Sequence, residues 1–385
     1  MIRRSYKIRL YPNQTQEDNL QVWLDRCRDL YNACIEVKKN HWKSAKISLS
    51  FWDLQKELPK VKKECPEFKE VNAAVLQDVN GRVDKAYRAF FRRCKSGEKP
   101  GYPRFKSFNR YDSFTHPQAE RCKWTSKRVY LSNFGWIRWK PWKDFEECTP
   151  KTLTFKREAD GWYCIVSCEL ENPIPLEPTG KEIGIDLGLH NLVATSDGDF
   201  LGDLNPLKKA EIKLRKLQEI KDRKKKGSNR RKKAVKQVAK AYQHLTRAKK
   251  YQLDVISRKL VNENDLIAIE DLDLVQLTNL GGDNAQGRGL RRNFGLAAFG
   301  ILTHMLTYKA EEAGRSLVKV DPRGTTQECS ECGIVVPKDL SVRTHSCPHC
   351  GLILDRDTNA AKNVLKRGQT LIRITVPPAP SITLD

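Results

Sequence analysis

The sequence lacks the features that would place the protein in a membrane or outside the cell. No apolar run approaches the roughly 18 residues that a membrane-spanning helix needs. The segment from Met1 to Tyr6 is basic and carries no apolar stretch of the kind found in a signal peptide. We therefore expect no membrane association and a cytosolic location.

Acidic residues are scarce relative to basic ones. The chain has 71 Lys and Arg but only 47 Asp and Glu among its 385 residues, which gives a net charge of +24. Solubility does not require an excess of this size, so it indicates a polyanionic partner, most simply nucleic acid. The imbalance is greatest between residues 206 and 250, where 19 basic residues stand against 3 acidic ones.

Two basic runs in this stretch, 224–226 and 230–233, have no balancing acids. Basic runs usually form a solvated helix face, but these would repel themselves without an external anion. We favour contact with a nucleic-acid backbone, whose affinity would fall steeply with salt. The predicted contact residues are Lys224, Lys225, Arg230, Arg231, Lys232, Lys233 and Arg323.

Several aromatic residues are interleaved with Lys and Arg and have two possible roles. They could stack on exposed bases or fill the core of a sheet, and the sequence favours neither role. These residues are Tyr102, Phe105, Trp124, Trp136, Trp139 and Trp142.

Close cysteine pairs are few. Of the 12 cysteines, only four form CxxC pairs, and 14 residues separate the two pairs. The four are Cys329, Cys332, Cys347 and Cys350. This is the spacing of a closed, structural Zn²⁺ site with four thiolate ligands. His345 and His349 lie close enough to compete, but four thiolates need no further ligand. The other cysteines are scattered, as buried or idle thiols of a reducing compartment are.

Hydrophobic periodicity divides the chain into two parts. Residues 3–10 alternate as a half-buried strand does, residues 15–95 are mostly helical, and residues from about 100 to 172 contain several short strands. This order suggests one β-barrel interrupted by a helical domain. The Pro-rich segment 172–178 then predicts a stiff linker.

Strands and helices alternate after the linker. Strands are expected at 182–186, 192–195, 266–270 and 317–320, and helices over 206–260 and 295–313. The glycine-rich segment 281–289 is not followed by the Gly-Lys-Ser/Thr of a phosphate-binding loop, and we interpret it as a mobile lid. Beyond about residue 370, no pattern could bury a core, which predicts a disordered tail.

Carboxylates end two of these strands and begin a further helix. Asp186 and Glu270 follow apolar runs, where burial is costly without a partner or a metal. Asp357 begins a helix just behind the cysteine pairs. Acids on separate elements can converge on two Mg²⁺ ions about 3.5–4 Å apart. Their order, strand–Asp–hairpin, strand–Glu and Asp–helix, is the one that an RNase H-like fold requires.

Each acid also has a simpler interpretation. Asp186 could be a turn residue, and Asp357 could cap its helix. Neighbouring acids could also take the place of Glu270 or Asp357, because one residue of register slip exchanges the faces of a strand. These competitors are Asp271, Asp273 and Asp355.

Together these motifs resemble the TnpB family, the RNA-guided DNA endonucleases that insertion sequences encode. The resemblance rests on segments 184–191, 269–272 and 356–363 and on the four-cysteine block, and segments 6–12 and 322–327 also fit. It covers nearly the whole chain.

The resemblance implies a multidomain α+β fold. A wedge β-barrel would occupy residues 1–12 and 100–178, with a helical recognition domain at 13–99. An RNase H-like (RuvC) α/β nuclease domain would occupy 179–322 and 352–369, with a zinc ribbon that binds target nucleic acid at 323–351 and a disordered tail at 370–385.

The resemblance also implies the site and its partners. Asp186, Glu270 and Asp357 would be the catalytic acids, with Asp357 preferred over Asp355 because it precedes the Thr-Asn-Ala-Ala sequence. The cofactors would be Mg²⁺ at the acids and structural Zn²⁺ at the cysteines. The partners would be a guide RNA from the transposon end and double-stranded target DNA next to a short motif. The protein would act as a monomer in a prokaryotic host.

Three other functions compete with this one. A nuclease-independent, RNA-guided DNA-binding repressor would need no metal-binding acids. A transposase with a tyrosine nucleophile commonly carries a His-x-His pair, which the sequence lacks. A RuvC-type resolvase would need neither the helical insert nor so large an excess of basic residues. We therefore expect a protein that cuts DNA.

Overall fold

The computed structural model describes residues 2–119, 122–141, 149–273, 276, 285–339 and 342–375. The chain folds into two compact units that divide between Asn172 and Pro173, at the start of the Pro-rich linker. No helix among the described residues is long and apolar enough to cross a membrane.

The first unit contains a seven-stranded antiparallel sheet with the strand order β2-β6-β7-β1-β5-β4-β3. The strands are β1 (Ile2–Tyr11), β2 (Ser113–His116), β3 (Lys123–Trp124), β4 (Arg128–Leu131), β5 (Gly135–Lys140), β6 (Thr149–Glu158) and β7 (Gly161–Leu170). The first strand of the chain is therefore central in a sheet whose other strands follow the helices. No pairing among the described residues joins β2 to β3, so a closed barrel remains a prediction.

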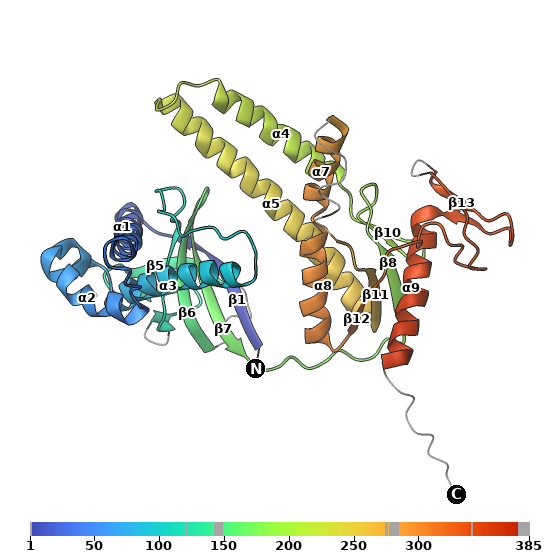
Figure 1. Cartoon of the computed structure of the whole chain (residues 1–385), viewed down its shortest axis with the longest axis horizontal. Helices are drawn as coiled ribbons and strands as arrows, with labels where there is room; N and C mark the ends of the chain where they lie inside the picture. The colour runs from blue at the N-terminus through green and yellow to red at the C-terminus, as the bar shows by residue number, and fades with distance from the viewer. Residues whose placement is uncertain are drawn as a thin grey trace, which may run out of the picture. The chain divides into compact units, whose positions relative to one another are not determined.

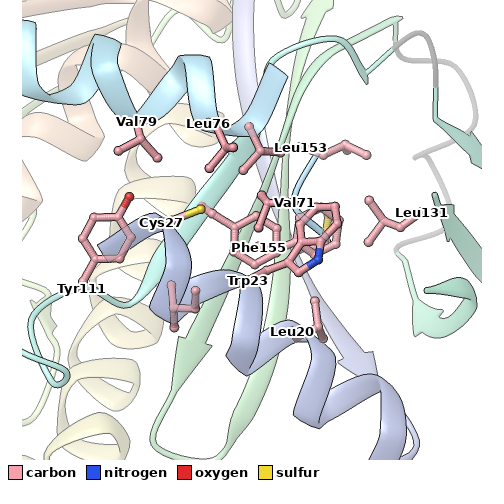
Figure 2. Close-up of a cluster of buried hydrophobic side chains, with 14 of the residues drawn as sticks. Leu20, Trp23, Cys27, Val71, Leu76, Val79, Tyr111, Leu131, Leu153 and Phe155 are labelled. Carbon is pink, nitrogen blue, oxygen red and sulfur yellow. The ribbon is translucent and has the colours of Figure 1, made fainter. Parts of the chain in front are cut away.

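Helices α1 (Gln14–Ala45), α2 (Phe51–Glu64) and α3 (Ala73–Lys95) and the short 3₁₀ helix η1 (Pro66–Glu70) lie between β1 and β2. The Asn13 side chain accepts a hydrogen bond from the Gln16 backbone nitrogen, and the Gln16 side chain accepts one from the Asn13 backbone nitrogen, which fixes the start of α1. Figure 2 shows Leu20 and Trp23 of α1, Leu76 of α3 and Phe155 of β6 meeting in the core. The helices are thus packed onto one face of the sheet.

The second unit contains a five-stranded sheet with the strand order β10-β9-β8-β11-β12. Its strands are β8 (Glu182–Asp186), β9 (Val193–Thr195), β10 (Phe200–Leu201), β11 (Leu266–Glu270) and β12 (Ser316–Val320). Strands β8, β11 and β12 are parallel, and β9 is antiparallel to both of its neighbours. A hairpin of β13 (Thr344–Ser346) and β14 (Ile353–Asp355) belongs to the cysteine-containing segment.

The helices of this unit are α4 (Asn205–Asp222), α5 (Asn229–Glu263), α7 (Ala285–Ala297), α8 (Phe299–Ala313) and α9 (Arg356–Thr375). Helices α4 and α5 form a long hairpin that extends away from the sheet (Figure 1). Isoleucines 183, 185, 267 and 269 pack against α5 and α8 in the larger core of the unit. Helix α9 lies on the opposite face.

Three expectations about local structure need correction. The helix predicted over 295–313 is two helices, because Ala298 adopts a left-handed conformation with φ of 53°. Residues 285–289 of the predicted lid begin helix α7, and residues 281–284 lie outside the described residues. The predicted tail begins too early, since α9 continues to Thr375 and so includes residues 370–375. Residues 376–385 lie outside the described residues.

Helix α9 approaches the sheet closely because small residues line the contact. A Cβ atom added at Gly184 of β8 would lie 2.1 Å from the carbonyl oxygen of Ala361 and 2.6 Å from the nitrogen of Leu365. A Cβ atom added at Gly368 of α9 would lie 2.6 Å from the Cβ atom of Ala268 in β11. The helix backbone therefore rests directly on the two central strands.

Replacing Gly184 with alanine should separate α9 from the sheet. We expect Gly184→Ala to lower the free energy of unfolding of the second unit by about 2 kcal/mol or more, because rigid backbone atoms must move. The control is Gly289→Ala in α7, where an added Cβ meets no atom within 4 Å and helix propensity improves. Urea unfolding checks both variants, and equal stability of the two would contradict the packing argument.

Candidate metal centres

Strand alternation directs two of the predicted acids toward α9. Asp186 is on the same face of β8 as Gly184, and Glu270 is on the same face of β11 as Ala268. Helix α9 covers Gly184 and Ala268. Parallel pairing sets Gly184 opposite Ala268 and Ile185 opposite Ile269, so Asp186 and Glu270 follow at the same edge of the sheet. Both are buried, with 7% and 8% of their surface exposed.

The third acid comes from the first turn of α9. Asp357 is 6% exposed. A Cβ atom added at Gly188, just beyond β8, would lie 3.9 Å from its Oδ2 atom. The charges of both Glu270 and Asp357 raise the pKa of Asp186, in agreement with this arrangement. The close contact of α9 with β8 thus brings Asp357 to the acids at the strand ends.

The competing acids have other contacts. Asp355 accepts hydrogen bonds from the backbone nitrogens of Asp357 at 2.8 Å and Thr358 at 3.1 Å, and so caps α9. Asp271 is exposed and lies 3.3 Å from the Lys319 amine. Asp273 is also exposed and accepts a hydrogen bond from the Gln276 backbone. This geometry favours Glu270 and Asp357 over their neighbours.

Mutual repulsion and burial disfavour full ionisation of the cluster. Burial raises the pKa of Asp186 to about 8, and the charges of Glu270 and Asp357 add to the increase. Burial also raises the pKa of Glu270, against the hydrogen bond from Thr325. A bound divalent cation would favour the charged carboxylates, and their hard oxygen atoms suit Mg²⁺.

Three side chains that the sequence did not reveal hold these acids. The Thr325 hydroxyl donates a 2.6 Å hydrogen bond to Oε1 of Glu270. Arg343 and Arg356 lie 3.4 Å and 3.1 Å from the Asp357 carboxylate. Thr325 and Arg356 fall in segments that carry the family resemblance, but their contacts depend on the tertiary fold.

Two asparagines of α9 tie the cysteine segment to this site. Asn359 accepts a 2.9 Å hydrogen bond from the Ser330 nitrogen and donates a 2.7 Å bond to the Glu328 carbonyl. Asn363 donates to the carbonyls of Thr325 and Glu328, both at 2.8 Å. Because both are buried, these bonds fix the segment that presents Thr325 to Glu270.

The four predicted cysteines form a compact group. Their sulfurs all lie within 4.8 Å of one another, with Cys329–Cys350 and Cys332–Cys347 distances of 3.6 Å. A disulfide would need about 2.0 Å, whereas Zn–S bonds of about 2.3 Å give tetrahedral S···S separations near 3.8 Å. The sulfurs therefore fit Zn²⁺. Among the described residues, the three acids are not drawn together as closely as the sulfurs.

Backbone geometry prepares both cysteine pairs for a metal. Each pair is followed by a glycine with positive φ, 77° at Gly333 and 76° at Gly351. The nitrogen of Cys329 donates to the Ile334 carbonyl, and the nitrogen of Cys347 donates to the Leu352 carbonyl. His345 instead contacts Lys338, and His349 is exposed, so neither histidine joins the group.

The predicted basic contact residues differ in their surroundings. Those in the α4–α5 turn and the start of α5 are exposed, as is Arg323, which lies two residues from Thr325. The exposed hairpin residues are Lys224, Lys225, Arg230, Lys232 and Lys233. Arg231 is half-buried and donates to the carbonyls of Lys221 and Lys224 at 2.8 and 3.0 Å. Arg231 therefore closes the hairpin.

The interleaved aromatic residues divide between core and surface. Trp139 is buried and Trp124 is half-buried. Tyr102, Phe105 and Trp136 are 42%, 52% and 42% exposed. Trp142 lies outside the described residues.

Three family models match the sequence. The IS605 OrfB model described as "Probable transposase" matches residues 165–280, and an associated "Helix-turn-helix domain" matches residues 1–46. The model "Cas12f1-like, TNB domain" matches residues 299–364. In this chain, the described part of this segment contains strand β1 and the single helix α1, so the helix-turn-helix label does not describe its structure.

Two curated proteins are similar over nearly their whole length. "Putative RNA-guided DNA endonuclease" of Streptomyces pristinaespiralis is 31% identical over 376 residues, covering 95% of this chain and 90% of that protein. "Putative RNA-guided DNA endonuclease InsQ" of Escherichia coli (strain K12) is 24% identical over 380 residues, covering 96% of this chain and 93% of that protein.

A solved structure shares the fold. A chain of the Cas12f1-sgRNA-target DNA complex, determined by cryo-EM, matches with a TM-score of 0.57 at 14% identity. The match covers 91% of this chain and 83% of that chain. The mixed α/β fold is therefore one that solved proteins also adopt.

The cysteine group should hold one zinc ion per chain. We expect Cys347→Ser to lose most of this zinc, because three thiolates no longer close the tetrahedron. Cys94→Ser serves as the control, since Cys94 is an exposed free thiol elsewhere in the chain. Atomic absorption measures the metal, and equal zinc content in Cys347→Ser and the unchanged chain would contradict the assignment.

The raised pKa of Asp186 predicts a pH-dependent stability. In metal-free protein, the folded chain keeps this proton to about pH 8, whereas the unfolded chain releases it above its ordinary value of 3.8. Asp186 therefore costs stability as pH rises between these values.

We expect Asp186→Asn to gain stability over the unchanged chain as pH rises from 4 to 8, by about 2 kcal/mol or more at the upper end. Urea unfolding in buffer without Mg²⁺ and without a chelator measures the difference, so that the cysteine group keeps any zinc it holds. The control is Asp271→Asn, whose carboxylate is exposed. A difference that does not change with pH would show that Asp186 does not carry the buried proton.

Proposed function

Because the chain belongs to the TnpB family, we propose that it is an RNA-guided DNA endonuclease whose RuvC-type site hydrolyses phosphodiester bonds with Mg²⁺ held by Asp186, Glu270 and Asp357. The observation that carries the proposal is the cluster of three buried carboxylates on the α9 face of the sheet. Without a bound cation, a cluster of this kind would lower the stability of the fold and would have no compensating interaction.

The sheet supports the same proposal. Its strand order, with β9 antiparallel to β8 and with β11 and β12 parallel to it, is the arrangement expected of an RNase H-like fold. In such a fold, the acids at the ends of neighbouring strands and the acid of the last helix share one site. Magnesium would supply charge neutralisation and an activated water when bound.

The residues of the chain have separate roles in this proposal. Asp186, Glu270 and Asp357 hold the metal, and Thr325 orients Glu270 through its hydroxyl. Arg343, half-exposed beside Asp357, is placed to meet the charge of a phosphodiester that enters the site. The zinc ribbon keeps Arg343 and Thr325 in position through its bonds to α9.

Recognition of the target would rest on RNA. We propose that a guide RNA from the transposon end pairs with one DNA strand, so that base pairing supplies most of the sequence specificity. The first unit would read a short motif beside the target. The exposed lysines and Arg230 of the α4–α5 hairpin, with Arg323, would contact the backbone of the guide or heteroduplex, and the chain would act as a monomer.

Cleavage of a guided target tests the proposal. The chain is purified with its bound RNA, that RNA is sequenced, and matching DNA flanked by a randomised segment is offered with Mg²⁺. We expect Asp186→Ala and Asp357→Asn to lower the cleavage rate more than about 100-fold, because each removes a direct metal ligand. Asp271→Asn, an exposed acid beside Glu270, should cut normally.

The result can also contradict the proposal. Unchanged cutting by Asp186→Ala, or the absence of bound RNA, would overturn it. Target binding by the unchanged chain without Mg²⁺-dependent cutting would favour an RNA-guided repressor instead.

A further inference from the structure

One face of the sheet in the first unit carries basic and aromatic side chains turned away from the core. Strands β4 and β5 alternate, with Val129 and Ile137 buried and Tyr130 and Trp136 36% and 42% exposed. The outward residues of the four strands β3, β4, β5 and β1 at this side of the sheet form what we call the outer face. They are Lys123, Arg128, Tyr130, Trp136, Arg138, Lys140, Arg9 and Tyr11.

The strand register arranges part of the outer face as a row of two arginines and a tyrosine. Arg128 of β4 lies opposite Arg138 of β5, which lies opposite Tyr11 of β1. The Arg138 guanidinium is 5.0 Å from the centre of the Tyr11 ring, and Tyr11 remains 43% exposed. A cation and an aromatic ring are thus presented together.

A second row lies two residues away along the strands. Lys123 of β3 is opposite Tyr130 of β4, which is opposite Trp136 of β5. The Tyr130 and Trp136 rings meet edge to face with centres 5.5 Å apart. Two large rings therefore stand on the surface next to the arginine row.

Acidic partners neutralise some basic side chains on this side of the sheet but not others. Lys7 and Arg9, toward β7, form ion pairs with Glu158 and Asp160. No acidic side chain among the described residues pairs with Arg128 or Arg138. Like charges directly opposite each other on antiparallel strands disfavour folding, so this pair indicates a surface that is completed by an external anion.

We propose that the outer face binds an unpaired segment of RNA, with bases stacked on Tyr130, Trp136 and Tyr11 and phosphates held by Arg128 and Arg138. Sheets that expose aromatic residues bind two or three unpaired bases in this way. A duplex keeps its bases inside the stack and could use the arginines but not the rings.

The choice of RNA rests on the proposed function. A bound guide carries unpaired loops and junctions at all times, whereas target DNA stays paired until it is opened. The basic runs 224–226 and 230–233 of the α4–α5 hairpin differ from the outer face, because they contain no aromatic residue and suit phosphates alone. The exposed tyrosines of the hairpin, Tyr242 and Tyr251, lie farther along α5.

Fluorescence anisotropy with the full RNA-free chain tests the proposal. The probes are a labelled, unstructured RNA of about 12 nucleotides, DNA of the same sequence, and the RNA annealed to its complement. Binding is measured over a series of salt concentrations, because salt weakens phosphate contacts far more than stacking.

Removing the rings should weaken binding without changing its salt dependence. We expect Tyr130→Ala/Trp136→Ala to bind the single-stranded RNA at least tenfold more weakly, since each ring can stack a base. Tyr130→Phe/Trp136→Phe keeps the rings and should stay within about threefold of the unchanged chain. The matched control is Trp52→Ala, an aromatic that is 70% exposed on α2.

Removing an arginine should instead change the salt dependence. Arg138→Gln should reduce the slope of log affinity against log salt by about 0.7, the value of one phosphate contact on a single strand. Arg3→Gln is the control, because Arg3 lies on the same sheet but is paired with Glu169 at 2.9 Å. Arg138→Gln keeps the test valid if the double alanine variant does not fold.

Three results would overturn the inference. In the first, the double alanine variant binds single-stranded RNA within about twofold of the unchanged chain. In the second, this variant loses as much affinity for duplex RNA as for single-stranded RNA. In the third, the unchanged chain binds single-stranded DNA as tightly as RNA. Because none of these measurements depends on cutting, they separate the two proposals. If guided cleavage occurs but the ring variants bind RNA as the unchanged chain does, only the outer-face assignment is overturned. If RNA binds as expected but no Mg²⁺-dependent cleavage occurs, only the proposed nuclease activity is overturned.

Discussion

The direct contact of α9 with β8 determines the geometry of the second unit. Gly184 leaves no side chain between the strand and the helix backbone, so α9 lies close enough for Asp357 to reach the acids at the strand ends. The same helix carries Asn359 and Asn363, which hold the cysteine segment. The positions of the sheet, the carboxylate cluster and the cysteine segment therefore all depend on the absence of a side chain at residue 184. A change at this contact would disturb all three.

The ribbon and the carboxylates depend on each other through short hydrogen bonds. The cysteine segment is too small to bury a core, so four thiolates around a metal would supply its stability. Once fixed, it presents Thr325 to Glu270 and Arg343 to Asp357. The cysteine segment therefore positions side chains around the acids without contributing a carboxylate of its own. Loss of the zinc would disorganise the contacts of two acids even though neither is a zinc ligand.

The sequence predicted what depends on local spacing and failed where tertiary contacts decide. Cysteine spacing identified the four thiolates, and apolar runs ending in acids located Asp186 and Glu270. Alternation alone could not choose between Glu270 and Asp271, because the choice depends on which face α9 covers. Likewise, Arg231 looked like any other residue of a basic run, yet it caps α4 within the hairpin. The break at Ala298 had no signal, since alanine favours helix.

Two kinds of basic surface follow from two kinds of element. The hairpin α4–α5 presents flexible lysines on helices, which suit phosphates whose position varies along a backbone. The outer face presents arginines between aromatic rings on a rigid sheet, and such a surface can distinguish unpaired bases from a duplex. A chain with a net charge of +24 would bind any polyanion if its charge were spread evenly. If both surfaces bind as proposed, separating backbone contacts from base contacts would allow the same excess charge to hold a folded RNA in one orientation.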